Sequence, residues 1–360
     1  MLDGLFKRAS KPLVGIDIST SSVKLIELSK TGNAYKVESF AAEAMPFNAI
    51  TDKVIMDLDS VGNAVRKVVK RASPRTKHAA VAVGGQVMTK TIQMPASLTD
   101  KELGEQIELQ ADQYISQPLD EVAFDYEILG VSKADPDLMD VLLVAARREN
   151  IEKLQAVLEI AGMDASVIDV EVYAVENACK LISHQMTDEG MDRTIGLVDF
   201  GAASTTFTVL HDRRIIYSYN TDFGGKQLTE EIMRHYGLTY EEAGKAKKEG
   251  GLPNNYKVEI LDPFVDDMAQ AVNRSLQFYQ SSSSEHQHLD QILLCGGCAA
   301  IPGAAERITG KLNTPTIVSN PFGRMKLSSR AKSQFVENEA AALLVACGLA
   351  LRSFDKYAKH

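Results

Sequence analysis

The chain has 360 residues, of which 45% are hydrophobic, and this is enough apolar surface for two or more packed units. Its formal net charge of −9 argues against a nucleic-acid binder or an anionic-membrane binder, because both need a basic face. No apolar run approaches the roughly 20 residues that cross a bilayer, so we expect a cytoplasmic protein.

The first clear pattern is a hairpin in the sequence VGIDISTSSVKLIEL, from Val14 to Leu28. An apolar strand ends at Asp17, a short turn of serine and threonine follows, and an alternating strand comes after it. This order of residues is typical of a β-hairpin. The preceding apolar residues Leu2, Leu5 and Phe6, with two basic neighbours, fit either a weak amphipathic anchor or an ordinary terminus.

The next segment alternates between helical and strand periodicities, as a mixed α/β architecture requires. Its own strands and helix make residues 88–146 look like an insert within the first half, with a Pro-Asp-rich loop at 133–138. We expect helices at 54–72, 100–115, 149–161 and 172–184, and strands at 78–83, 87–94, 122–129 and 141–146.

A second hairpin, GLVDFGAASTTFTVL, follows from Gly196 to Leu210. Aligning Asp17 with Asp199 also aligns Ser22 with Ser204, about 180 residues apart, so a duplicated fold is expected. After this hairpin, helical patterns occur at 226–235, 241–249, 259–280, 303–311 and 338–352.

The two hairpins are candidates for binding phosphate. The P-loop pattern is absent, since Gly224-Gly225-Lys226 is followed by Gln227, and no GxGxxG follows the first strand. Tight turns of small residues instead offer successive backbone N–H groups as an anion nest. Because the two aspartates would repel a polyphosphate, the pattern calls for a Mg²⁺ between them, held mainly through water.

A third motif, ILLCGGCAAIPG, spans Ile292 to Gly303. Gly296 and Gly297 leave a flat surface for an adenine ring, although a strand-to-helix turn without a ligand has the same pattern. Cys295 and Cys298, with His286 and His288 upstream, could form a zinc site. The alternative of reduced core cysteines fits an apolar strand better.

Together, the two hairpins and the Gly-Gly turn resemble the two phosphate motifs and the adenosine motif of the actin, Hsp70 and sugar-kinase superfamily. Within it the chain is similar to the FtsA-like branch. The opening LFKRASKPLVGIDISTSSVKLIEL and the ending ENEAAALLVACGLALR resemble the PilM family of type IV pilus assembly proteins. The resemblance covers nearly the whole chain.

This resemblance implies an actin-like ATPase (ribonuclease H-like) fold of class α/β, in which two duplicated domains flank a nucleotide cleft and the first carries an FtsA-like insert. The first domain is expected at 12–87 and 147–192, with the insert at 88–146 and a C-terminal return at 331–360. The second domain is expected at 193–223 and 292–330, with its subdomain at 224–291.

The resemblance also implies the ligands, Mg²⁺ and ATP, and the residues around them. Asp17 and Asp199 are expected near the metal, and Glu171 is expected to orient water for a slow hydrolysis at most. An acid that favours the dipole at a helix N-terminus would have the same place. Glu242 and Lys245 fit the spacing of a nucleoside contact, although both, with Lys247 and Lys248, also fit a solvated helix face. The helix start at Gly224, Gly225 and Lys226 is expected near the ribose and phosphates. The remaining expected contacts are Ser19, Thr20, Ser21, Ser22, Lys24, Gly201, Ala202, Ala203, Ser204, Thr205, Gly296 and Gly297.

The partner that the resemblance implies is the N-terminal cytoplasmic tail of the membrane protein PilN, in a groove beside the insert, with the region from Met88 to Tyr126 as the expected contact. This tail would connect the protein to the pilus alignment complex, the pilus motor ATPases and twitching motility, and would hold it at the inner membrane. Homo-oligomerisation, a small-molecule kinase and a head-to-tail filament remain open as alternatives.

Overall fold

The computed structural model describes residues 12–84, 87–283, 288–334 and 337–355. The expected N-terminal anchor therefore lies outside the described residues, as does His286. The chain divides into two compact units. The first unit comprises Met1–Glu27, Ala41–Glu171 and Leu349–His360, and the second comprises Leu28–Phe40 and Val172–Gly348.

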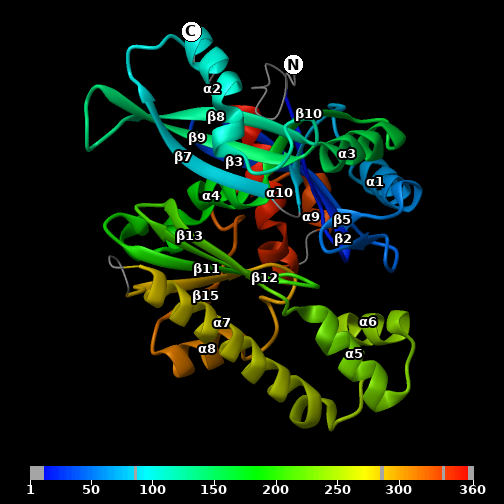
Figure 1. Cartoon of the computed structure of the whole chain (residues 1–360). Coiled ribbons are helices and arrows are strands. Elements are labelled where there is room, and N and C mark those ends of the chain that lie inside the picture. The colour runs from blue at the N-terminus through cyan, green and yellow to red at the C-terminus, as the bar shows by residue number, and fades with distance from the viewer. Residues whose placement is uncertain (1–11, 85–86, 284–287, 335–336, 356–360) are drawn as a thin grey trace. The chain divides into compact units, whose positions relative to one another are not determined.

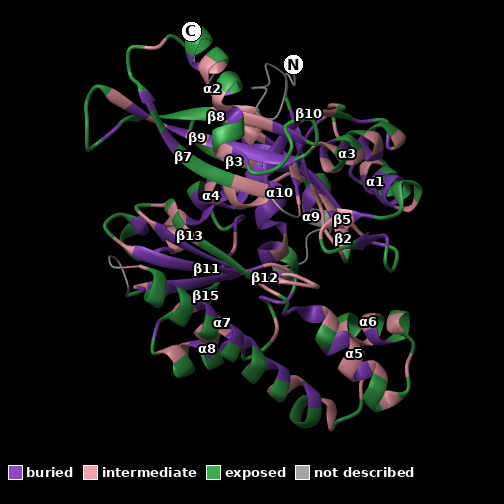
Figure 2. Cartoon of the chain, in the orientation of Figure 1, coloured by how far each residue is buried: buried purple, intermediate pink, exposed green. Residues whose placement is uncertain are grey.

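The first unit is built on a sheet whose neighbouring strands follow the order β10-β6-β1-β2. Strands β1 and β2 are antiparallel, whereas β1, β6 and β10 run parallel to one another. The parallel strands are largely apolar and buried, as strands covered on both faces are (Figure 2). Their bounds are β1 Val14–Ile18, β2 Ser22–Thr31, β6 His78–Val83 and β10 Asp164–Val170.

The helices of the first unit pack closely against each other. Helix α1 (Leu58–Ala72) begins at an N-cap, Asp57, whose side chain accepts from the Ser60 N–H. Hydrogen bonds from the Ser60 side chain and from the Ser60 backbone hold the pKa of the Asp57 carboxyl below its usual value. A Cβ at Gly62 of α1 would lie 2.4 Å from the side chain of Ile160, the last residue of α3 (Arg148–Ile160). Glycine therefore lets α1 and α3 approach each other (Figure 1).

The second unit repeats this sheet. Its order is β13-β12-β11-β14-β15, and β12-β11-β14-β15 matches β2-β1-β6-β10 in both order and direction. The expected duplication is thus present in the strand topology. The bounds are β11 Thr194–Phe200, β12 Thr205–His211, β13 Arg214–Thr221, β14 Gln291–Cys295 and β15 Thr316–Val318.

The core of the second unit lies between this sheet and the long helix α7 (Asp262–Ser282), beside α8 (Ala304–Leu312) (Figure 1). Helices α5 (Gly225–Tyr236) and α6 (Tyr240–Glu249) form a pair that packs on the same core. Fully buried members of the core include Phe200 and Phe207 from the sheet and Met268 from α7.

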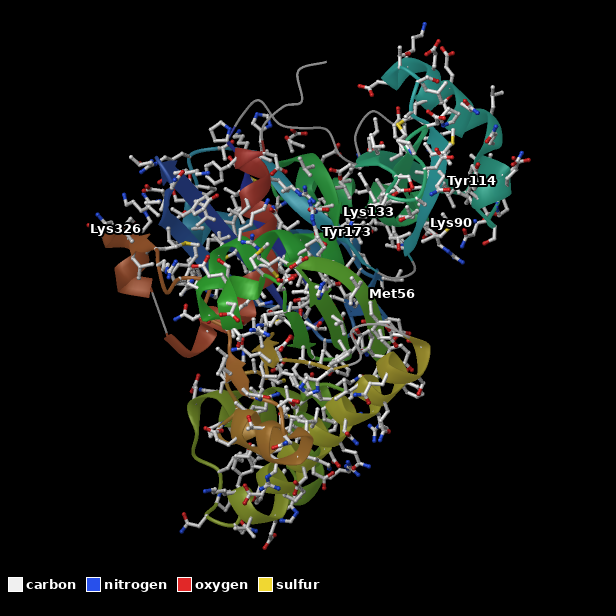
Figure 3. The ribbon with its side chains drawn as sticks, turned by 90° about the vertical axis from the view of Figure 1, so that its left-hand side faces the viewer. Met56, Lys90, Tyr114, Lys133, Tyr173 and Lys326 are labelled. Carbon is white, nitrogen blue, oxygen red and sulfur yellow. The ribbon has the colours of Figure 1, made fainter. Side chains whose placement is uncertain are left out.

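The insert is a three-stranded antiparallel sheet with one helix on it. The order is β7-β9-β8, with β7 Val87–Pro95, β8 Val122–Val131 and β9 Leu138–Arg147. Helix α2 (Asp100–Tyr114) covers one face, and a capping box between Thr99 and Glu102 fixes its start. Lys90 of β7 lies over the ring of Tyr114 at 5.5 Å, and the two are labelled together in Figure 3.

Most predicted elements are present within two residues, but four bounds were wrong. Strand β9 begins at Leu138, three residues earlier than expected. Residues Val54–Ile55 form β5, paired with β4 (Ile50–Thr51), so helix α1 begins four residues later than expected. The long helix is preceded by a π-helical turn at Lys257–Leu261. The C-terminal helix is divided into a 3-10 segment, Glu337–Leu343, and α10 (Leu344–Leu351).

The remaining elements lie mostly in the second unit. They are β3 (Ala34–Ala44), which pairs in parallel with β16 (Lys326–Leu327), α4 (Glu171–Ile182), α9 (Ser329–Gln334), and short 3-10 turns at Ser183–Gln185, Thr187–Gly190 and Arg352–Phe354. Within the described ranges, none of the helices has the length and apolar character needed to cross a bilayer.

Candidate functional site

The first predicted hairpin is formed by β1 and β2. Asp17 lies opposite Lys24 in the ladder, and the Ser19 N–H donates to the Ser22 carbonyl at 3.0 Å. Thr20 and Ser21 therefore form the tip of a tight turn. Neither of their backbone N–H groups has an acceptor among the residues that the structure describes.

Asp17 already has a cation beside it. The Lys24 ammonium donates to Asp17 Oδ2 at 2.8 Å and to Ser19 Oγ at 3.3 Å, and the Ser19 hydroxyl donates to the Ser22 carbonyl. Both charged side chains are largely buried, with 14% exposure for Lys24 and 12% for Asp17. The lysine thus fixes the aspartate and the turn in one network, which sequence spacing alone does not reveal.

The second predicted hairpin, β11 and β12, has the same turn. Asp199 lies opposite Thr206, and the Gly201 N–H donates to the Ser204 carbonyl at 3.0 Å. The position of Lys24 is therefore taken by a threonine in the second copy. In the described part of the chain, the N–H groups of Ala202 and Ala203 at the tip also have no acceptor.

The start of helix α5 holds this second turn in place. The N–H groups of Gly225 and Lys226 donate to the carbonyls of Gly201 and Ala202, at 3.0 and 2.8 Å. A Cβ at Gly224 would lie 2.4 Å from the Ala202 carbonyl oxygen, so this position requires glycine. The helix begins where expected, but two of its first N–H groups support the turn and are not available to a ligand.

The Gly-Gly turn after β14 lies against the other side of the hairpin. Gly296 has a φ of +87°, and an added Cβ would lie 2.1 Å from Asp199 Oδ1. The Cys298 N–H donates to the Phe200 carbonyl at 3.1 Å. Gly297, in contrast, has nothing within 4 Å of its Cβ position, so only this second glycine leaves open space.

The acidic residue and the lysine predicted on α6 have different surroundings. Glu242 completes a capping box with Thr239, whose N–H holds the pKa of the Glu242 carboxyl below its usual value. Lys245 is exposed and pairs with Glu249 at 3.8 Å. Both line a cavity of about 510 Å³ with Tyr236, Leu238 and the loop 250–253.

Lys247, for which a solvated helix face was the alternative, contacts helix α5, which supports the second turn. Its ammonium donates to the Gly225 carbonyl at 3.0 Å and to Thr229 Oγ1 at 2.7 Å. Burial lowers the pKa of Lys247. No sequence pattern separates Lys247 from the neighbouring lysines, because the packing of α6 on α5 determines which of them reaches Gly225.

Glu171 lies at the edge of the first unit's sheet where the parallel strands end. Ile16 of β1 pairs with Val81 of β6, and Val81 pairs with Ile168 of β10. Ser19, Gly84 and Glu171 each come the same number of residues after these paired positions, so they follow the three strand ends at the same level of the sheet. With strands about 4.8 Å apart, the end of β10 is roughly 10 Å from the end of β1. Glu171 Oε2 accepts from Lys53 Nζ at 2.7 Å.

The four cysteines lie in the core of the protein. All four are free and buried, and burial raises the pKa of the Cys298 thiol despite the nearby Lys247 ammonium. Among the described residues no group of three or more His, Cys, Asp or Glu side chains could hold a metal, and His286 of the considered zinc site lies outside them.

Each hairpin on its own fits a phosphate ligand. The turn tips present N–H groups without an acceptor in the described chain, and glycines keep the support of the second turn free of side chains. Asp17 is paired with Lys24, so a magnesium ion held mainly through water suits it better than direct coordination.

The comparisons with known proteins agree with this geometry. The family model described as type IV pilus assembly protein PilM matches residues 15–354. Cell division protein FtsA of Bacillus subtilis (strain 168) is 22% identical over 355 residues, covering 86% of this chain and 78% of FtsA.

Solved structures show the same fold. A structure described as a PilM-PilN type IV pilus biogenesis complex has a TM-score of 0.79 and 24% identity, covering 97% of this chain and 100% of that one. MreB5 of Spiroplasma citri bound to ADP has a TM-score of 0.52 and 11% identity, covering 94% of this chain and 95% of MreB5. The chain has the actin-like ATPase fold, as expected.

Proposed function

The chain belongs to the type IV pilus assembly protein PilM family, and we propose that it is an ATP-binding scaffold that takes the cytoplasmic N-terminal tail of PilN. The proposal of ATP binding rests on the register that the two hairpins share. In both, an aspartate lies two residues before a bond that closes the same four-residue turn. MreB5, which has the same fold, was solved with ADP.

In this proposal the turn amides of residues 20–21 and 202–203 bind phosphate oxygens. Ser22 and Ser204 supply hydroxyl groups, and Gly201 lets the backbone come close. The Ser19 hydroxyl already donates to the Ser22 carbonyl, and the buried Thr205 hydroxyl donates to the Phe223 carbonyl at 2.7 Å, so these two expected contacts are not part of the proposal. Bound Mg²⁺ would neutralise phosphate charge between Asp17 and Asp199. Lys24 fixes Asp17, while Lys247, Gly224, Gly225 and Gly296 keep the second turn and Asp199 in place.

We assign the nucleoside to the second unit. Gly297 provides open space after β14, and Glu242 and Lys245 line the cavity beside α6. Lys226 opens α5 and forms an i,i+4 pair with Glu230 at 3.8 Å. Turnover is expected to be slow at most, with Glu171 as the proposed water-orienting residue. We propose the first domain at 12–87, 147–192 and 331–360, the insert at 88–146 and the second domain at 193–330. The compact units divide the chain differently, because residues 28–40, 172–192 and 331–348 belong to the second unit.

The partner site is proposed at the insert. The solved relative is described as a complex of PilM with PilN, and β7 and β8 are the edge strands of the insert's sheet among the residues that the structure describes. Extended peptides bind such edges by strand addition. Ile128, Leu129 and Val131 of β8 are exposed apolar residues that a peptide could cover. Contact with the tail would place the protein at the cytoplasmic side of the inner membrane.

A labelled synthetic PilN tail tests the scaffold role. We expect it to bind the full chain with saturable fluorescence anisotropy, and a scrambled tail not to bind. If nucleotide and tail are coupled, Mg-ATP must change tail affinity by the same factor by which the tail changes ATP affinity. Sedimentation with and without Mg-ATP separates a monomeric scaffold from a filament. Absence of tail binding, with Mg-ATP still bound, would refute the scaffold role alone.

A further inference from the structure

The ion pair between Lys53 and Glu171 joins residues 118 positions apart. The Nζ–Oε2 distance is 2.7 Å, and the side chains are 28% and 33% exposed. The lysine belongs to the β4–β5 hairpin and the glutamate to the first residue of α4. Solvent reaches both groups, so this pair can open at low cost.

The hairpin turn holds Lys53 at the edge of the sheet. Asp52 and Lys53 have φ angles of 49° and 62°, the conformation of a two-residue turn with both central residues left-handed. An added Cβ at Gly84, which follows β6, would lie 2.9 Å from the Lys53 Cβ and 3.1 Å from its carbonyl oxygen. Lys53 therefore packs against the end of β6. This strand lies between β1, which leads to Ser19, and β10, which leads to Glu171.

We propose that Lys53 is a positioning residue that restrains Glu171 and thereby slows ATP hydrolysis; this inference rests on the proposed nucleotide site. In hydrolysis the oxygen of a water bonds to the terminal phosphorus, the bond from that phosphorus to the bridging oxygen breaks, and ADP, phosphate and a proton are released. Glu171 can direct the water only by accepting its hydrogen bond. In the structure one carboxylate oxygen of Glu171 already accepts from Lys53.

The ion pair itself can be tested without nucleotide by exchanging the charges. Lys53→Glu places two carboxylates together, and Glu171→Lys places two ammonium groups together, so each single variant should lower the melting temperature. The double variant restores opposite charges and should recover most of the loss. If the losses of the two single variants simply add in the double variant, the pair does not restrain Glu171 and the proposal is wrong.

The effect on hydrolysis is measured as phosphate release at saturating Mg-ATP. Lys53→Met should raise turnover about three- to tenfold, which corresponds to freeing one hydrogen-bonded group in the reacting state. Its Mg-ATP affinity should stay within about twofold of the original chain. Glu171→Gln, alone or with Lys53→Met, should have no turnover. The matched control is Lys67→Met, since Lys67 is exposed and pairs with Glu43 at 3.6 Å in the same unit.

Calorimetry with Mg-ATP distinguishes a failure of the proposed nucleotide site from a failure of the restraining role of Lys53. If the original chain does not bind Mg-ATP, the proposed nucleotide site fails and this inference fails with it. If binding is normal but Lys53→Met leaves turnover unchanged or lowers it, only the restraining role is refuted. If Lys53→Met weakens Mg-ATP binding more than about tenfold, Lys53 contacts the nucleotide and the proposal is likewise refuted.

Discussion

The backbone of Gly296 lies directly against the carboxylate of Asp199, so close that a Cβ on Gly296 would be 2.1 Å from Oδ1. The same Cβ would be 2.5 Å from the Phe200 carbonyl oxygen. Gly296 also has a φ of +87°, which L side chains rarely adopt. The turn after β14 thus determines where the acid of the second hairpin lies.

Gly296→Ala should destabilise the second unit and weaken nucleotide binding. The backbone conformation alone costs about 1–3 kcal/mol for a non-glycine residue, and relief of the contact with Asp199 adds to it. We expect a clear drop in the melting temperature of the variant. The neighbouring substitution Gly297→Ala is the control, because nothing lies within 4 Å of its Cβ position. Equal melting temperatures for the two variants would contradict this account.

Lys247→Met should loosen the start of α5. It removes the donor to the Gly225 carbonyl and to Thr229 Oγ1, and losing such bonds at a largely buried site costs about 1–3 kcal/mol. Since α5 holds the second turn, Mg-ATP affinity should fall as well. Lys248→Met is the matched control, because Lys248 is exposed on the same helix and does not line the cavity beside α6. A larger loss of Mg-ATP affinity for Lys248→Met, measured by calorimetry, would contradict this role of Lys247.

The pH dependence of the free energy of unfolding should also reflect the burial of Lys247. Burial lowers the pKa of Lys247 below its ordinary value of 10.5. Between the folded-state pKa and 10.5, the unfolded state binds more protons, so this residue's contribution to stability rises with pH across that window. Below the folded-state pKa the contribution is constant. Between pH 8 and pH 10, the free energy of unfolding measured with urea should rise less, or fall more, for Lys247→Met than for the original chain. Identical changes in the two proteins would contradict the prediction.

Leu143→Ala should unfold or loosen the insert and abolish binding of the PilN tail. Leu143 is fully buried in β9, the central strand of the insert, and such a truncation costs about 2–5 kcal/mol. Leu109→Ala on α2 is the control, because that leucine is 81% exposed and its truncation should change stability by less than about 0.5 kcal/mol. Hydrogen exchange of β7 to β9 measures the difference. Tail binding that survives in a loosened insert would move the partner site elsewhere.

The hairpins could be predicted from the sequence because their information is local. An apolar strand, an aspartate and a turn of small residues recur about 180 residues apart, and the structure confirms the alignment of Asp17 with Asp199 in matching registers. The insert was equally recognisable, since its strands and helix have clear and different periodicities. The strands β3, β10 and β13 were not predicted; β3 and β13 mix polar with apolar residues in an irregular order.

Other features depend on tertiary packing and could not be predicted. Lys245 and Lys247 are indistinguishable in a lysine-rich helix, yet only Lys247 points at the carbonyl of Gly225. The spacing of Glu242 fits a ligand contact, but the structure shows its carboxylate capping its own helix. The ion pair of Lys53 with Glu171 joins residues 118 positions apart, which no local pattern could connect.

The most direct test of the account is a calorimetric titration of Mg-ATP, and of ATP with EDTA, into the full chain and into Asp17→Asn, Asp199→Asn and the control Asp112→Asn, whose aspartate is exposed on α2. We predict binding that needs Mg²⁺ in the original chain and in the control, and a loss of at least about tenfold, or 1.4 kcal/mol, in each of the other two variants. Unchanged affinity in both of those variants would contradict the proposal that the two hairpins share one magnesium nucleotide.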